Sequence, residues 1–563
     1  ASYIQVMRVT KRATALLAAA LMLLNLSAAD SQPYSGRTGD AVIGAPPGHR
    51  PSTIVYKTED QRLLKISDPT GEYLRLLLPG HHHTQEPGQP ELPVWSRLIE
   101  VPDGMDPVVT VSNVITRKIR LSEESPSGAE IYPAQPARTK NQLPQDKVII
   151  KDRKIYETRG IVMHDTVKVT HEGIFRGRRL ANVAVYPAFY DPAGKYVDLI
   201  TSMKLNISFE PSGAKGEDET GDSFNKGGFS SDSYITGYTD RPVNMIIVTD
   251  STFLKHLGPL VKWKMLKGIR STIICKGPGP ADTVYKDLKT RISQLYFNLE
   301  EQGSPVHYLL IAGDPSIIPT SRGTTNVSDL YYGEFDGQGD YIPELFIGRL
   351  PAADTTQLKG MVKKIIDYET LRYGSETDFW KRALATAGNA PGFELYMNGQ
   401  VSYIYNTYLK PDTSLKSIRW LYPDAPLKDD SLKIMFNKGL SILNYTGHGE
   451  ATGFSDPQFR TSMTAELTNE NEYPLIIANA CRTAQINVAN CFGTAMVATP
   501  GKGSIGFIGC TNDSYWSDDF FWAVGPGTPG LNVTYETSGT GAFDRLFHTH
   551  GEPPGDWYYT MGQ

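Results

Sequence analysis

Cysteine is scarce in this sequence. Its 563 residues include only Cys275, Cys481, Cys491 and Cys510. A chain held together by disulfide bridges carries cysteine far more densely, so bridges are not what stabilises this fold. Each thiol can therefore be weighed separately, as a packing group or as a reactive one. The length exceeds what one hydrophobic core usually organises, which predicts two or more folded units.

A basic excess is also lacking, because the net charge is −5 and charged residues make up 21% of the chain. This balance argues against nucleic acid as a partner. The apolar run at 16–26 follows Arg8, Lys11 and Arg12, and it is too short to span a membrane comfortably. We interpret residues 7–29 as a signal peptide with a small-residue cleavage site. The expectation is Sec export without a transmembrane segment, to the secreted fraction or the outer-membrane surface.

Short β-rich segments punctuated by Pro and Gly fill residues 52–211, which predicts an all-β sandwich or barrel. A polar stretch rich in Gly, Ser and Asp follows at 213–234 and has no periodicity, as in an exposed linker. Linkers of this kind are where proteases cut. We therefore predict an N-terminal β-rich domain at 30–226 and a linker at 227–242.

From residue 243 to 563 apolar runs alternate with amphipathic helical stretches. The runs include NMIIVT, STIIC, HYLLIAG, SILNYTG and PLIIANA. This alternation predicts an α/β domain with a mostly parallel sheet. In such sheets, sites form beyond the carboxyl ends of the strands.

Two of these predicted strands end in reactive side chains. SILNYTGHGE places His448 between Gly447 and Gly449, and PLIIANAC ends at Cys481. If the strands are parallel neighbours, imidazole and thiol emerge at one edge, as a Cys–His nucleophilic pair requires. Taken singly, the Cys is more often a core residue and the His a surface turn residue. Their joint placement favours the catalytic pair.

The same segments carry a family resemblance. GHGE at 447–450, the Cys that ends PLIIANAC, the later CFGTA and SYWSDDFFW together resemble the gingipain (C25) cysteine peptidases, in particular their lysine-specific branch. The N-terminal GQPELPVWSRLIEVPDG is similar to the family's inhibitory propeptide. The resemblance implies a caspase-like catalytic domain, protein or peptide substrates, and a propeptide that inhibits its own enzyme. It also implies a catalytic domain that continues past residue 563.

Carried over by position, the resemblance makes Cys481 the nucleophile and His448 the general base and acid. The backbone N–H groups of Gly449 and Cys481 would form the oxyanion hole. It also implies a pocket for a basic side chain, preferably Lys, whose lining comprises Thr446, Asn479, Tyr515, Trp516 and Asp519. An acidic group behind aromatic walls suits an ammonium and its aliphatic stem. From spacing alone, Asp518 and Asp519 would be an ordinary solvated turn.

The third catalytic member departs from the family pattern. The family has an acidic residue just after the strand that corresponds to RALATAG, and here Ala390 stands at or beside that place. Asn389 could orient the imidazole through its amide oxygen, and Glu394 is the nearest carboxylate. Two other functions therefore stay open. One is a caspase-like transpeptidase or sorting enzyme, and the other is a catalytically weak surface binding protein.

Acidic residues crowd the loop SDLYYGEFDGQGDYIPE at 328–344. Oxygen ligands there would suit Ca²⁺, which the resemblance also implies. The expected ligands are Asp314, Asp336, Asp340, the carbonyl near Ile342, and Glu344.

Two further features need an interpretation. The triplet His81–His83 lacks a fourth ligand at metal-site spacing and is expected to be an exposed loop. Lys226, in the polar stretch at 213–234, is the predicted maturation site, given the expected specificity for Lys.

Overall fold

The computed structural model describes residues 4–6, 52–68, 70–124, 129–140, 149–162, 164–212, 243–322, 327–337, 340–371, 378–410, 416–426, 430–552, 557, 558 and 560. The predicted signal peptide and the maturation site at Lys226 lie outside these residues. Within them, no helix has the length and apolar character needed to cross a membrane.

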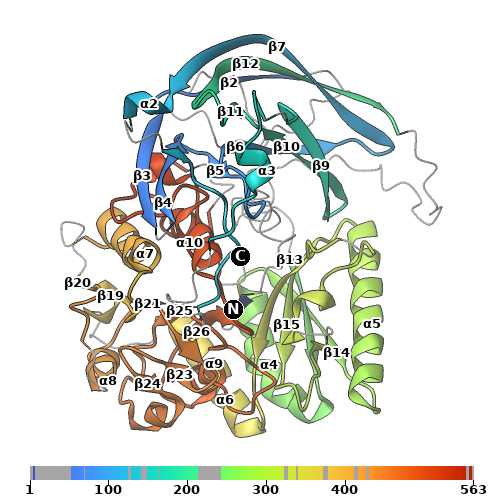
Figure 1. The fold of residues 1–563 in the computed structure, drawn as a ribbon. Coiled ribbons are helices and arrows are strands. Elements are labelled where there is room, and N and C mark those ends of the chain that lie inside the picture. Colours follow the sequence, from blue (N-terminus) through green and yellow to red (C-terminus); the bar gives the residue numbers. More distant parts are fainter. Residues whose placement is uncertain are drawn as a thin grey trace.

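The N-terminal part is built from strands and lies above the C-terminal part in Figure 1. One sheet has the order β5-β6-β10-β9, another has β11-β12-β2 with β7 added to β12, and a third has β3-β4-β8. The strands are β2 (Ser52–Lys57), β3 (Arg62–Asp68), β4 (Gly71–Leu77), β5 (His82–His83), β6 (Pro93–Val101), β7 (Met105–Arg120), β8 (Glu130–Ile131), β9 (Val167–Phe175), β10 (Arg178–Val185), β11 (Ala188–Asp191) and β12 (Tyr196–Pro211). Two short helices, α2 (Leu121–Glu124) and α3 (Arg153–Tyr156), accompany them. The prediction that the N-terminal part is β-rich is confirmed.

Alternating burial explains why these sheets pack on one another. In β12, Met203, Leu205 and Ile207 are buried while the residues between them are less so. Successive side chains of a strand point to opposite faces, so this pattern presents one apolar face. That face packs against Tyr56 and Trp95 of neighbouring strands.

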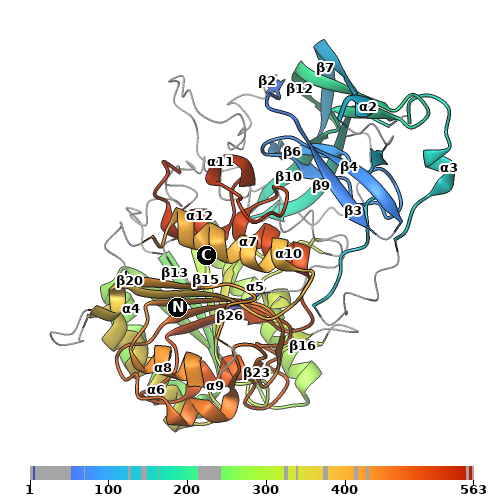
Figure 2. The same cartoon turned by 60° about the vertical axis from the view of Figure 1, so that its left-hand side comes forward.

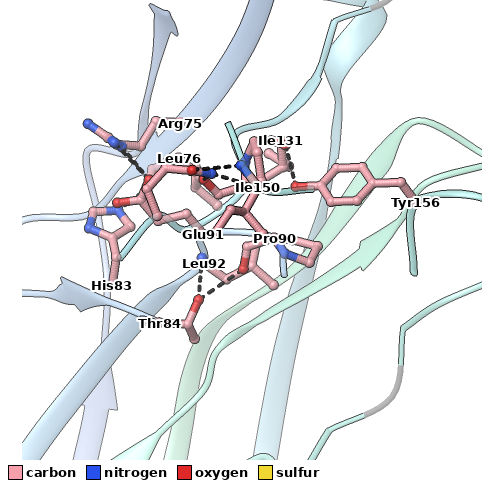
Figure 3. A network of polar contacts seen from close by, with 12 residues as sticks. Arg75, Leu76, His83, Thr84, Pro90, Glu91, Leu92, Ile131, Ile150 and Tyr156 are labelled. Carbon is pink, nitrogen blue, oxygen red and sulfur yellow. Dashed lines mark hydrogen bonds and ion pairs between the residues drawn. The ribbon is translucent and has the colours of Figure 1, made fainter. Parts of the chain in front are cut away.

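A polar network joins the β3-β4-β8 sheet to the β5-β6 region (Figure 3). The guanidinium of Arg75 donates twice to Glu91 Oε2, at 2.9 and 2.7 Å. Tyr156 donates to the carbonyl of Ile131 at 2.7 Å. The ring of His83 lies beside the Arg75–Glu91 pair and donates through Nε2 to the carbonyl of Leu76 at 2.8 Å.

The prediction of an exposed loop at His81–His83 is wrong. His82 and His83 form strand β5, and His81 is buried between the Tyr56 hydroxyl and the Pro79 carbonyl, each 2.8 Å from a ring nitrogen. The sequence pattern of Gly and Pro around the triplet indicated a turn, but packing against Tyr56 decided the outcome. Burial lowers the pKa of His81 to about 4 and that of His82 to about 3, and it also lowers the pKa of His83.

The C-terminal part contains two parallel sheets rather than the single sheet that the alternation suggested. The first has the order β14-β13-β15-β18 and the second β1-β26-β25-β21-β19-β20. Their strands are β1 (Ile4–Val6), β13 (Val243–Thr249), β14 (Ile269–Cys275), β15 (Val306–Ala312), β18 (Phe346–Leu350), β19 (Arg382–Ala387), β20 (Lys416–Trp420), β21 (Ile442–Thr446), β25 (Leu475–Asn479) and β26 (Gly506–Cys510). Short strands are β16 (Ser321–Arg322), β17 (Val327–Ser328), β22 (Gly449–Glu450), β23 (Gly453–Phe454) and β24 (Phe459–Arg460).

Helices cover both faces of the second sheet, as Figure 2 shows. One face carries α7 (Glu394–Thr407), α10 (Trp516–Val524) and α12 (Ala542–Phe547), and the opposite face carries α6 (Thr355–Glu369), α8 (Asp430–Asn437) and α9 (Phe492–Ala498). The remaining helices are α4 (Leu254–Leu266), α5 (Ala281–Glu301) and α11 (Tyr535–Ser538), and 3₁₀ turns occur at η4 (Ser251–Phe253), η5 (Leu330–Tyr332), η6 (Asp378–Lys381) and η8 (Thr461–Glu466). Alternate residues of β19 join the two cores: Ala383 and Ala385 pack with α7, and Leu384 faces α9. Strands buried on both faces explain the near-continuous apolar runs.

Acidification should destabilise the N-terminal part by protonating His81 and His82. Their folded-state pKa values lie below the ordinary 6.5, so the stability they contribute is complete above that pH and is lost as pH falls from 6.5 towards 4. The loss is about 1.4 kcal/mol per pH unit for each histidine that titrates. We expect the hydrogen-exchange protection factors of the β4–β6 amides to be lower at pH 5 than at pH 7, and the difference to shrink in the double variant His81→Gln/His82→Gln.

His171 provides the matched control, since 54% of its side chain is exposed. His171→Gln should keep the full acid loss of protection. Equal protection of the wild-type amides at both pH values would contradict the assignment of neutral, buried imidazoles.

Candidate active site

The two reactive side chains lie at one edge of the second parallel sheet. Strands β21 and β25 are parallel neighbours, and Thr446 stands opposite Asn479. His448 and Cys481 each follow two residues later, and the N–H of Gly447 donates to the carbonyl of Asn479 at 3.2 Å. The expectation that these strands are parallel neighbours is confirmed. Their register delivers imidazole and thiol to the same edge.

The thiol of Cys481 is completely buried in this form of the protein. Its Sγ accepts the backbone N–H of Ser514 at 3.4 Å. Burial raises the pKa of the Cys481 thiol. The N–H of Ser514 and the Lys140 ammonium act in the opposite direction, whereas Asp513 and Asp519 add to the rise. The sulfur is therefore covered and held as a thiol.

His448 stands beside a tryptophan and a cation. Its ring meets Trp516 edge to face, with the ring centres 5.5 Å apart. Burial lowers the pKa of His448, the ammonium of Lys140 lowers it further, and a hydrogen bond with the Lys140 backbone raises it. The net effect favours the neutral imidazole, which is the form that can accept a proton from a thiol.

Gly449 is sterically required at its position. A Cβ placed there would lie 2.8 Å from the Cβ of Ala480 and 3.1 Å from the carbonyl oxygen of Cys481. The His448 loop and the Cys481 loop are thus in close main-chain contact. This contact brings the backbone of the two residues predicted to form the oxyanion hole together.

Three of the predicted pocket residues surround a single cation, the side chain of Lys140. The Lys140 Nζ lies 2.6 Å from Asp519 Oδ2 and donates to the carbonyl of Asn479. It also stands 4.7 Å from the centre of the Trp516 ring. Lys140 is fully buried, so its charge is balanced inside the pocket by the Asp519 carboxylate.

The other two pocket residues complete the surroundings. Thr446 is paired with Asn479 across the sheet, and its hydroxyl donates to the buried Gln400 Oε1 at 2.8 Å. Tyr515 pairs through its main chain with Thr139 in an antiparallel bridge. All five residues predicted for the pocket therefore lie around one place at the carboxyl edge of the sheet.

The segment that carries Lys140 lies as an added strand against residues 514–516. The N–H of Lys140 donates to the carbonyl of Ser514 at 3.0 Å, and the N–H of Trp516 donates to the carbonyl of Arg138 at 3.2 Å. Extended peptides bind exposed main chain in this way, with main-chain bonds for affinity and a side-chain pocket for specificity. The N-terminal part occupies the site as a peptide ligand would.

Sequence reasoning missed Lys140. It lies in YPAQPARTK, a stretch without periodicity between β8 and α3, and nothing in its composition separates it from the other basic residues. The available signal was the pocket itself: a pocket expected to bind Lys, in a chain expected to inhibit itself, predicts a lysine in the inhibitory segment.

The acidic loop brings three of the predicted metal ligands together. Carboxylate oxygens of Asp336, Asp340 and Glu344 lie within 4.8 Å of one another. Asp314 is not in this group; its carboxylate caps the turn after β15 by accepting the N–H and hydroxyl of Ser316, at 3.0 and 2.6 Å. Ile342 donates its N–H to Asp340 at 2.9 Å.

The three carboxylates fit a divalent cation. Glu344 is 2% exposed, and its Oε1 is buried without a hydrogen-bond partner in the described structure. Burial, with Asp336 and Asp340 adding to it, raises the pKa of Glu344 to about 10, and burial also raises the pKa of Asp340. Crowded oxygen ligands with an unused lone pair match the preference of Ca²⁺.

Comparison with known proteins decides the family. The model of peptidase family C25 matches residues 238–563, and the model of the C25 propeptide matches residues 49–241. The chain belongs to peptidase family C25. Its strand-rich N-terminal part is a C25 propeptide, and Lys140 lies in that propeptide.

Several relatives share most of this chain. Lys-gingipain of Porphyromonas gingivalis is 28% identical over 513 residues, which are 87% of this chain and 29% of the relative. A Gingipain R1 of the same species is 24% identical over 82% of this chain and 47% of its own length. A solved structure described as "Structure of Protease" aligns with a TM-score of 0.52 and 29% identity, covering 55% of this chain and 69% of the other. The chain thus spans less than half the length of these two gingipains.

The structure reduces the number of candidates for the residue that would orient His448. Glu394 accepts the N–H of Gly392 at 3.0 Å, so its carboxylate closes the turn that precedes α7. Ala390 is buried and apolar. Asn389 follows β19, which pairs with β21, and the adjoining Gly388 packs against Gly447. Among the described residues no hydrogen bond joins Asn389 or Glu394 to His448, although Asn389 lies on the loop beside it.

Proposed function

We propose that this chain is the zymogen of an exported cysteine endopeptidase that cleaves after basic residues, preferably lysine. The observation that carries the proposal is Lys140, buried against Asp519, Trp516 and the carbonyl of Asn479. Family C25 membership and the shared register of His448 and Cys481 support it. Export rests on the sequence of residues 7–29.

The pocket chemistry favours an ammonium. Lys140 places a compact point charge between a carboxylate, a carbonyl oxygen and an aromatic face, and its whole side chain is buried. An arginine would bring five donors in a rigid fork to the same few acceptors. The unmatched N–H groups of a buried guanidinium would each carry a desolvation cost.

The proposed reaction follows from the residues at the sheet edge. His448 accepts the Cys481 proton, and the thiolate attacks the carbonyl carbon of the substrate's lysine residue. The N–H groups of Gly449 and Cys481 stabilise the oxyanion, and His448 then protonates the leaving amine. Water releases the acyl group from Cys481 and restores the free thiol. An amine acceptor in place of water would make the same site a transpeptidase.

In the zymogen the propeptide blocks these reaction steps. Lys140 fills the pocket, residues 138–140 hold the main chain of 514–516, and Cys481 is completely covered. Cleavage after Lys226, the proposed site directly before the linker at 227–242, would let the propeptide leave.

The pocket assignment predicts the substrate specificity of the enzyme. On paired Lys and Arg peptides the matured enzyme should favour Lys, and Asp519→Asn should lower kcat/KM for Lys by roughly 100-fold or more, because a buried cation loses its partner. Cys481→Ala is the inactive control. A preference for Arg would overturn the pocket assignment. Transfer of the acyl group to an added amine in place of hydrolysis would favour the transpeptidase.

The burial of Lys140 also predicts the latency of the full chain. Iodoacetamide should modify Cys481 slowly in the full chain and at least about tenfold faster in Lys140→Ala, since the segment loses the buried pair that holds it. Lys151→Ala is the matched control, because Lys151 is a propeptide lysine paired with Glu130 rather than with the catalytic part. Equal alkylation of wild type and Lys140→Ala would remove the basis for self-inhibition by this residue.

We also propose a structural Ca²⁺ held by Asp336, Asp340 and Glu344. The support is the orphaned, buried Glu344 oxygen among repelling carboxylates. A bound dication would let all three ionise together and would fix the loop.

Calcium should therefore raise the thermal midpoint of the chain, and Glu344→Gln should abolish that rise. Asp314→Asn should keep it, since Asp314 caps its own turn. Calorimetric titration with CaCl₂ measures the binding directly. An unchanged midpoint and no heat of binding would reject the site.

A further inference from the structure

Arg482, the residue directly after Cys481, has a left-handed backbone with φ of 57°. Glycine adopts this conformation freely, and Asn and Asp adopt it more readily than other residues with a Cβ. A long cationic side chain gains nothing from the conformation itself. Its presence here points to a use for the side chain.

Three hydrogen bonds hold the strained residue to the loop that follows β26. The Arg482 N–H donates to the carbonyl of Asn512 at 2.9 Å. The guanidinium is bidentate, with Nε 2.7 Å from Asp513 Oδ1 and Nη2 3.1 Å from Asp513 Oδ2. Paired bonds of this kind fix orientation as well as distance. The loops after β25 and β26 are thereby fastened to each other.

The fastened loop carries the groups that meet the thiol and the substrate. Ser514 directly follows Asp513, and its N–H donates to Cys481 Sγ at 3.4 Å. The carbonyl of Ser514 receives the N–H of the bound Lys140, and the chain continues into the pocket wall at Trp516. A shift of Asp513 would move the sulfur's donor and the substrate's acceptor together.

The Arg482–Asp513 ion pair also changes the charge around the Cys481 sulfur. The charged or titratable groups facing the Cys481 sulfur are the Lys140 ammonium, the Asp513 and Asp519 carboxylates, the His448 imidazole across the sheet edge, and the Cys510 thiol. Asp519 is neutralised by whichever lysine fills the pocket. Asp513 has the Arg482 guanidinium as its cation, 2.7 Å away. The guanidinium thus offsets the carboxylate that most directly opposes a thiolate.

We propose that Arg482 is a positioning residue for the reaction, clamping Asp513 so that the Ser514 N–H stays on the sulfur and the adjacent carboxylate stays neutralised. Arg482 acts through Asp513 and Ser514, and it need not contact the substrate. The role in turnover rests on the proposed peptidase function, whereas the effect on the thiol does not.

The thiol is tested first, in the full chain, by following thiolate absorbance against pH with Cys481→Ala subtracted. Arg482→Ala should raise the Cys481 titration midpoint by about one pH unit, because an opposing charge loses its partner. Asp513→Asn should lower the midpoint, and the double variant should lie near wild type. Arg482→Lys, which keeps the charge without the fork, should recover most of the midpoint.

Turnover is tested in chains that also carry Lys140→Ala, which frees the pocket. Arg482→Ala should lower kcat for a Lys peptide by roughly tenfold with KM little changed, because the displaced group serves the reacting sulfur. Arg482→Ala combined with Asp513→Asn should regain the thiol midpoint but not kcat, because the hydrogen bonds between the two loops are still missing. Lys416→Ala, which removes an exposed ion pair with Asp378, is the matched control.

A wild-type thiol midpoint and wild-type kcat in Arg482→Ala would overturn the proposal. Should Arg482→Ala fail to fold, Asp513→Asn carries the same test, because it removes the other half of the pair, and a wild-type thiol midpoint in that variant would overturn the proposal. A chain that hydrolyses no peptide would reject the peptidase function, and the thiol titration would still decide the role of Arg482.

Discussion

The arrangement of this protein depends on one buried ion pair, between the propeptide's Lys140 and Asp519 of the catalytic part. Leaving either charge unpaired in the interior would cost several kcal/mol, so the two parts are held in one relative position wherever the pair persists. The main-chain bonds of 138–140 with 514–516 follow from that position. Cys481 is completely buried in the same arrangement. The same contact places a propeptide lysine among the residues of the proposed pocket.

The second constraint is the register of β21 and β25. Because Thr446 lies opposite Asn479, equal steps along the two chains reach His448 and Cys481 at the same edge. Close packing then limits what can stand there, as the lack of space at Gly449 shows. The strained backbone of Arg482 belongs to the same turn, and its bonds to Asn512 and Asp513 join a third strand end to the site. Three loops thus meet where an open parallel sheet places its chemistry.

Residues within a few positions of one another were predicted best. The apolar runs located the strands of the catalytic part, and the loop at 328–344 brought three carboxylates together as expected. Predictions failed where distant residues decide the environment. The His81–His83 triplet has the sequence pattern of a turn among Gly and Pro, but His81 is buried with hydrogen bonds to Tyr56 and Pro79.

The sequence by itself determined the order of elements, the family resemblance, and the placement of a thiol and an imidazole at two strand ends, because periodicity and short motifs are local properties of the chain. Tertiary structure alone decided that Lys140 pairs with Asp519, that Arg482 reaches Asp513, and that Glu394 closes its own turn. Those outcomes depend on which surfaces meet after folding. Burial then fixes their energetic weight, since a charge far from water must find its partner in whatever segment lies beside it.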